Sequence, residues 1–172
     1  TEDQIIEGNV DLSSGNIEAN GNVIIKKNIT PGFSVNAKGH ITVEGNIEEG
    51  SVRCGKDLTV KGGVLGNPDS LIEVGGNFKA SFLSNATVRV QGDVDINLYA
   101  MNTHITSNGS IRAVSEKKGK VVGGTLSALM GIEVYEAGSP SGLKTIFIAG
   151  IDLDKEKELQ DQVEAEEHAE EK

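Results

Sequence analysis

Apolar and polar residues alternate in short runs that recur along most of the chain. Within a nine-residue segment, apolar side chains occupy the first, third, seventh and ninth positions, which is the period-two pattern of strands with one buried face. Seven such segments begin at Ile17, Val35, Val52, Ile72, Val88, Ile105 and Leu126. The starts are 18, 17, 20, 16, 17 and 21 residues apart, so the chain is an internal repeat with a period of about 18 residues.

Each repeat predicts two strands joined by a sharp corner. The fifth position is usually glycine and the sixth is often Asn or Asp; the glycines are Gly21, Gly39, Gly76, Gly92 and Gly109. Glycine adopts a positive φ without strain and Asn and Asp tolerate it, so we expect left-handed backbone at this corner. A third apolar position at Ile29, Ile47 and Val64 indicates a third short face in the early repeats. One repeat cannot bury its apolar face alone, which predicts that the repeats stack as a parallel β-helix.

The residues of the second strand bear on the handedness of this β-helix. Apolar positions 17, 23, 29, 35, 41 and 47 follow a six-residue period, which is similar to the left-handed hexapeptide-repeat β-helix of acyltransferases. That fold carries a small residue two positions before each large one, whereas here the second strand has two large aliphatic residues, as in Val23 and Ile25. The later spacings of 16, 20 and 21 residues also break the period. The expected fold is therefore an all-β, single-stranded, right-handed parallel β-helix of about seven to eight short turns.

The C-terminal segment has a different composition. We expect residues 1–151 to form the β-helix domain and residues 152–172 to form an acidic α-helix or coiled-coil segment that is cut short. The segment holds ten acidic residues and three lysines, and it places acids in the first turn, where the helix dipole favours them. Its apolar stripe is thin and consists of Leu153, Leu159 and Val163. A helix of this kind needs a partner to be stable.

Charge and composition exclude several classes of function. The net charge is −10, and an acidic chain repels phosphate backbones, so we expect no nucleic-acid binding. Four Phe, two Tyr and no Trp are too few for a stacking surface. No apolar run approaches the ~20 residues of a membrane span, and no signal peptide is evident. The single cysteine, Cys54, suits a reducing compartment, which leads us to expect a cytoplasmic protein.

The chain shows no constellation of catalytic, cofactor-binding or metal-binding residues. Cys54 occupies an inward column of small residues, which predicts a buried, inert thiol. His40 lies at the corner position that Asn or Asp fills in other repeats, His104 precedes a strand, and His168 lies in the acidic segment. None of these histidines has a second ligand at metal-binding spacing. We therefore expect no catalytic site, no cofactor and no metal.

The outward positions and the aromatic residues are the remaining candidates for a ligand-binding or partner-binding site. The outward column of the first strand is mixed and alternates in sign, which favours stabilisation of stacked turns over a sugar-acid site; it comprises Glu18, Asn36, Arg53, Glu73, Arg89, Thr106 and Ser127. Phe33, Tyr99 and Tyr135 fall at or near predicted corners. There they either anchor a partner or pack over a neighbouring corner.

Three stretches of the sequence resemble one bacterial family. They are Gly21–Glu48, which contains Ile29-Thr-Pro-Gly-Phe-Ser-Val, then Gly119-Lys-Val-Val-Gly-Gly-Thr-Leu-Ser-Ala, and finally Lys144-Thr-Ile-Phe-Ile-Ala-Gly-Ile-Asp. Their order is similar to that of the flagellar assembly protein A family, in which a charged coiled-coil segment follows a β-helix. The resemblance implies a cytoplasmic bacterial scaffold or protein-interaction module associated with flagellar assembly or polar organisation. It supplies no catalytic residue.

Two other functions stay open at this point. A bactofilin-like protein also uses short β-helix turns and polymerises end to end, and a β-helix enzyme such as an acyltransferase or a polysaccharide lyase is a third and weaker alternative. The expected partners are other proteins. A homo-oligomer through the C-terminal helix or the ends of the β-helix is also compatible with the sequence, which predicts no particular partner-binding residue.

Overall fold

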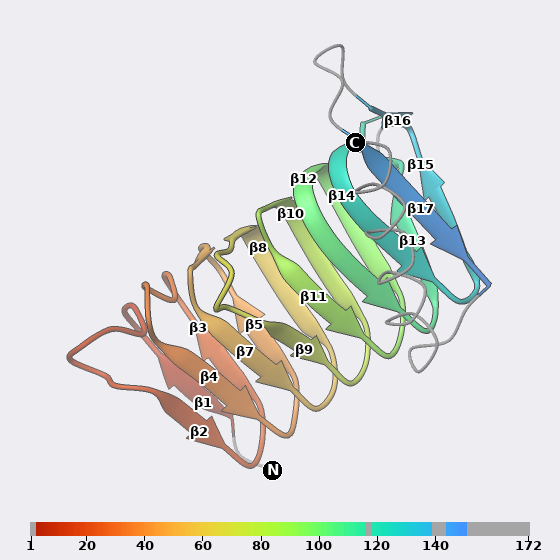
Figure 1. Cartoon of the computed structure of the whole chain (residues 1–172). Helices are drawn as coiled ribbons and strands as arrows, with labels where there is room; N and C mark the ends of the chain where they lie inside the picture. The colour runs from red at the N-terminus through yellow and green to blue at the C-terminus, as the bar shows by residue number, and fades with distance from the viewer. Residues whose placement is uncertain (1–2, 116–117, 139–143, 151–172) are drawn as a thin grey trace.

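The computed structural model describes residues 3–115, 118–138 and 144–150, and all the strands in these ranges form one parallel sheet. The sheet winds into a solenoid of about eight turns with three faces (Figure 1). The predicted acidic helix over residues 152–172 lies outside the described residues. Within the described part, no helix is both long and apolar enough to cross a membrane.

Each face is a stack of short parallel strands contributed by successive turns. The first face consists of β2 (Ile17–Ala19), β4 (Ser34–Ala37), β7 (Ser51–Cys54), β9 (Ile72–Val74), β11 (Thr87–Val90), the ends of β12 (Val94–Ser107) and β14 (Lys120–Ala128), and β17 (Thr145–Ala149). The second face consists of β1 (Gln4–Ile6), β3 (Val23–Ile25), β5 (Ile41–Val43), the first halves of β8 (Leu58–Leu65) and β10 (Phe78–Ser84), the start of β12, β13 (Ser110–Ala113) and β15 (Gly131–Val134). The third face consists of β6 (Ile47–Glu48), the second halves of β8 and β10, the middle of β12, the start of β14 and β16 (Glu136–Ala137).

The strand register confirms the repeat read from the sequence. All seven predicted starts are Cα partners in adjacent turns, and the column continues to Phe147: Ile17, Val35, Val52, Ile72, Val88, Ile105, Leu126 and Phe147. The third apolar column is also confirmed at Ile29, Ile47 and Val64, and it extends past the early repeats to Leu83 and beyond. The inward columns form the core: Val23, Ile41 and Leu58, which stack in successive turns of the second face, are each about 1% exposed.

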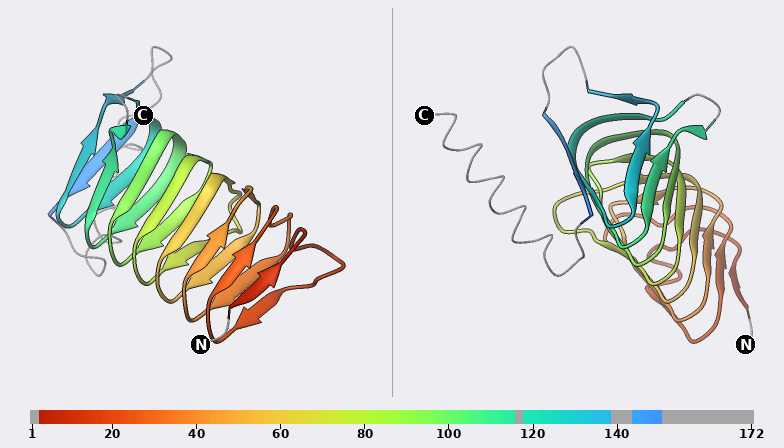
Figure 2. Two further views of the ribbon diagram at one scale, coloured as in Figure 1. Left: turned by 180° about the vertical axis from the view of Figure 1, so that it is seen from behind. Right: turned by 90° about the vertical axis from the view of Figure 1, so that its right-hand side faces the viewer.

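The direction of winding is visible along the solenoid axis. In the right-hand view of Figure 2 the C-terminal turns face the viewer, β17 descends on the left, and the strands of the second face rise on the other side. The chain therefore turns anticlockwise as it advances towards the viewer. This makes the solenoid right-handed, as the paired aliphatic residues of the second strand predict.

The first corner, between the first and second faces, keeps a constant length. The first-face column and the second-face column are six positions apart in every turn, as from Ile17 to Val23 and from Leu126 to Ile132. The corner between the second and third faces varies, from five positions between Phe78 and Leu83 to ten between Ile111 and Val121. The extra residues of the longer repeats therefore lie outside the first corner.

The reason for glycine at the first corner differs from the sequence-based prediction. Gly39, Gly76, Gly92 and Gly109 do not have a positive φ, so the predicted left-handed backbone at this corner is wrong. A Cβ atom added at Gly92 would lie 2.2 Å from Oδ1 of Asn77 in the preceding turn. Glycine is required because a neighbouring side chain fills the space. Positive φ angles occur at Gly131 in the first corner of the last repeat, and at Asn85 and Asn102 in the third corner, between the third face and the next first-face strand.

Candidate interaction surface

A ladder of side-chain hydrogen bonds runs along the first corner. The backbone N–H of each corner residue donates to the side chain of the corner residue one turn earlier, over Asn22, His40, Asp57, Asn77, Asp93 and Ser110, at 2.8–3.2 Å. His40 takes part through Nδ1, which accepts from the N–H of Asp57 at 3.2 Å. His40 therefore replaces an Asn or Asp in a structural ladder, as its corner position predicts.

A second ladder begins at the corner between the second and third faces. Asn9 accepts from the N–H of Asn28 at 2.9 Å, and Asn28 accepts from the N–H of Asn46 at 2.7 Å. Asn46 accepts in turn from the N–H of Gly63 at 2.9 Å, and Gly63 has no side chain to continue the series. The ring of Phe82 fills the space beside Gly63, because a Cβ atom there would lie 2.3 Å from the ring.

Phe82 and Tyr99 follow Gly63 at the equivalent position of the next two turns, where their rings stack. Phe82 and Tyr99 are Cα partners in adjacent turns, and their ring centroids lie 5.3 Å apart at an interplanar angle of 21°. Tyr99 thus packs over a neighbouring corner, which is one of the two roles that the sequence leaves open. Phe33 is half-buried against the core, whereas Tyr135 is 57% exposed.

An apolar patch surrounds this stack on the outside of the third face. Along β10, Leu83 is fully buried and points inward, so its neighbours Phe82 and Ser84 point outward. Leu65 and Met101 are the Cα partners of Ser84 in the adjacent turns, and they are 38% and 43% exposed. We define the apolar patch as Leu65, Phe82, Tyr99 and Met101.

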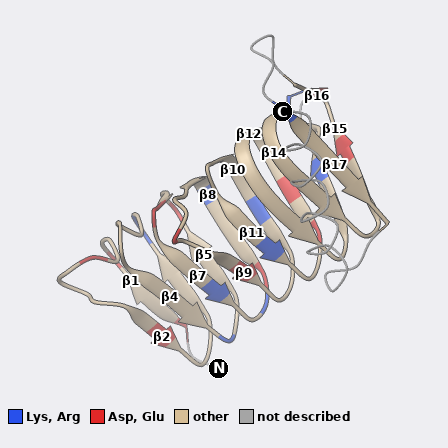
Figure 3. Ribbon diagram, viewed as in Figure 1, with Lys and Arg blue, Asp and Glu red and all other residues tan. Residues whose placement is uncertain are grey.

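Charged residues occur in successive turns of the solenoid (Figure 3), and several of them form ion pairs between neighbouring turns. Arg53 and Glu73 lie 3.2 Å apart, as expected for an outward column that alternates in sign. Glu44 contacts Lys26 at 3.2 Å and Lys61 at 3.6 Å. The hydrogen bond from Lys26 holds the pKa of Glu44 below its ordinary value. Exposed ion pairs of this kind contribute little to the stability of the fold. Their main effect is that each of these charged side chains has an oppositely charged neighbour.

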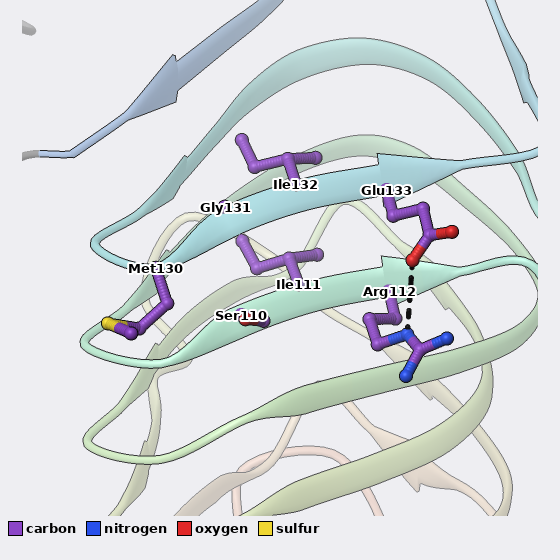
Figure 4. Close-up of a pocket in the computed structure, with 7 residues that line it drawn as sticks. All are labelled: Ser110, Ile111, Arg112, Met130, Gly131, Ile132 and Glu133. Atoms are coloured by element: carbon purple, nitrogen blue, oxygen red, sulfur yellow. Dashed lines mark ion pairs between the residues drawn. The ribbon is translucent and has the colours of Figure 1, made fainter.

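The second face carries a surface hollow near its C-terminal end. A shallow hollow of about 360 Å³ lies along β13 and β15 (Figure 4). Its two charged residues, Arg112 and Glu133, face each other at 3.4 Å and form an ion pair. Among the described residues, no group of three or more His, Cys, Asp or Glu side chains is placed to hold a metal ion.

Cys54 lies where its repeat position predicts. It is 2% exposed, and its thiol lies 3.2 Å from the carbonyl oxygen of Gly39 and 3.3 Å from that of Asp57. Burial raises the pKa of the Cys54 thiol, which keeps the unreactive protonated form dominant. His104 is exposed on the first face, and His168 lies outside the described residues.

Most of the apolar patch was not predicted from the sequence. The sequence indicates Tyr99 as a candidate by its position near a corner, whereas it gives no such indication for Phe82, Leu65 or Met101. One signal could have found Phe82: it precedes Tyr99 by 17 residues, which is one turn of the repeat and places the two rings side by side.

The family model described as the Flagellar Assembly Protein A beta solenoid domain matches residues 3–172. No curated protein and no solved structure matches the chain.

Proposed function

Because the chain belongs to the Flagellar Assembly Protein A beta solenoid family, we propose that it is a non-catalytic scaffold on which other proteins of flagellar assembly dock. The observation that carries this proposal is the apolar patch on the third face. Aromatic residues and Met are enriched at the centres of protein interfaces, and here they gather on the outside of a fold whose core is already filled.

The rigidity of the patch supports a docking role. Phe82 and Tyr99 hold each other by stacking, and the strands that carry them are paired on both sides by parallel strands. A partner that binds such a surface orders few side chains, so little of its binding free energy is lost to conformational entropy. We place this role in the cytoplasm, which suits a free thiol at Cys54.

The proposal is tested in the bacterium that encodes the chain. In cells that lack the gene, variants Met101→Glu and Leu65→Glu are expressed at wild-type levels and flagella are counted. We expect both variants to restore fewer flagella than the wild-type protein, because a charge in the patch opposes burial by a partner. The matched control is Thr42→Glu, an outward position of β5 on the second face. Full restoration by both patch variants would overturn the proposal.

End-to-end assembly is a second candidate function, favoured by the last described turn. Phe147 continues an inward column, yet it is 40% exposed, whereas its partner Leu126 is fully buried. Light scattering of the chain over a hundredfold range of concentration tests this candidate. A mass that rises with concentration supports filament formation, and a constant mass contradicts it.

A further inference from the structure

The outward column of the first face changes character along the solenoid. In the early turns its residues are charged or polar and reach solvent, as with Glu18, Arg53 and Arg89. In the last turns the same column holds Thr106, Ser127 and Ile148, which are 6%, 0% and 8% exposed. Side chains that point away from the core are therefore buried at this end.

The sequence of β17 gives an independent indication. Thr145-Ile-Phe-Ile-Ala carries apolar residues at both inward and outward positions. A parallel strand with two apolar faces is typical of a sheet that is covered on both sides. The neighbouring outward residue Thr125 on β14 is also only 8% exposed.

No described element supplies this cover. Every described strand belongs to the wall of the solenoid, as Figures 1 and 2 show. The Oγ atom of Ser127 is buried and has no hydrogen-bond partner among the described residues. We call the outer surface of β12, β14 and β17 the covered face, because its outward side chains are buried. No described residue accounts for this burial.

We propose that residues 151–172 of the same chain pack across the covered face. The segment begins directly after β17, where Gly150 has a φ of +84° and its N–H donates to the carbonyl oxygen of Ala128 at 2.9 Å. This bond holds the start of the segment at the edge of the covered face. As a helix, these 22 residues would span about 33 Å, which exceeds the ~15 Å across three strands.

The chemistry of the two surfaces is complementary. Leu159 and Val163 are four residues apart and would share one side of a helix, which suits the apolar side chains of the covered face. The acidic side chains of the segment can then face solvent. Arg89 lies next to Thr106 in the outward column of the first face, one turn towards the N-terminus. It is exposed and has no ion pair within the described ranges, so it offers a positive charge at the border of the covered face.

Hydrogen exchange and cleavage by a Glu-specific protease test the proposal on the full chain. Ser127→Glu places a charge in the covered face, and Asn36→Glu places the same charge in the same column near the N-terminal end. A second pair acts from the segment itself, where Leu159→Asp removes an apolar contact and Gln160→Asp is its control. We expect roughly tenfold faster cleavage within residues 151–172 for Ser127→Glu and Leu159→Asp, with little change in the two controls.

The outcomes separate the possible occupants. Faster cleavage confined to the two test variants, at unchanged circular dichroism of the solenoid, supports the proposal. A segment that is cleaved and exchanged as rapidly in the wild-type chain as in the variants overturns it. Protection that disappears on dilution also overturns it, because the occupant is then a second copy of the chain. None of these results depends on whether the apolar patch binds a partner.

Discussion

Substitution of Gly92 by alanine tests why glycine is needed at the first corner. Gly92 does not have a positive φ, so alanine is compatible with its backbone. The new Cβ atom would lie 2.2 Å from Oδ1 of Asn77 and 2.7 Å from the carbonyl oxygen of Gly76. Oδ1 of Asn77 must then move away, and its 2.8 Å hydrogen bond from the N–H of Asp93 is lost.

The expected effect on stability follows from these contacts. Loss of the hydrogen bond costs about 1 kcal/mol, and the displacement of backbone in a packed corner costs about 1–3 kcal/mol. The reduced entropy of the unfolded chain returns about 0.4–1 kcal/mol, so the free energy of unfolding should fall by about 2 kcal/mol. Gly8 is the matched control, since nothing lies within 4 Å of its added Cβ atom, and Gly8→Ala should be neutral or slightly stabilising.

The assay is urea unfolding followed by far-ultraviolet circular dichroism. Gly92→Ala is measured in the wild-type chain and in an Asn77→Ala background, where the hydrogen bond and the nearest clash are already absent. The cost of Gly92→Ala should be about 1 kcal/mol smaller in that background. A stabilising Gly92→Ala, or an identical cost in both backgrounds, would refute the steric explanation.

Three further predictions concern the core, a surface pair and the thiol. Ile41→Asp buries an unpaired charge and should unfold the middle turns, and a circular dichroism melt that matches wild type would contradict the inward column. The pKa of Glu44 is lowered, so its pair with Lys26 stabilises the fold above the ordinary pKa of 4.5, and this contribution is lost as the pH falls. The melting temperature of Glu44→Gln should therefore decrease less between about pH 5 and 3 than that of the wild-type chain. Cys54 should react with Ellman's reagent only after urea unfolds the chain; rapid reaction of the folded protein would contradict its burial.

The columns of the solenoid could be predicted from the sequence because inward positions require apolar residues in every turn. Ile105 and Leu126 fall in register although their positions differ by 21, since the extra residues lie in corners. The prediction of left-handed backbone at the corner glycines was wrong for a specific reason. Neighbouring turns approach each other there, and the clash involves residues about 17 positions apart that a local turn rule does not include.

The apolar patch and the covered face depend on outward positions, for which the repeat imposes no residue type. Whether Met101 or Ser127 is exposed depends on what lies outside the wall, and the alternation of inward and outward positions is the same in both cases. Packing across turns, such as the stack of Phe82 on Tyr99, becomes visible only once the register is known.

Because the first corner has a constant length, equivalent positions on the first two faces recur at regular intervals along the solenoid axis. Each turn advances the chain by one strand spacing, about 4.8 Å, while the six-residue interval keeps the first two faces aligned. Duplication or deletion of one whole repeat would therefore change the distance between two docking points in steps of this size. A lineage can adjust the length of such a protein by whole repeats and leave the chemistry of each face intact.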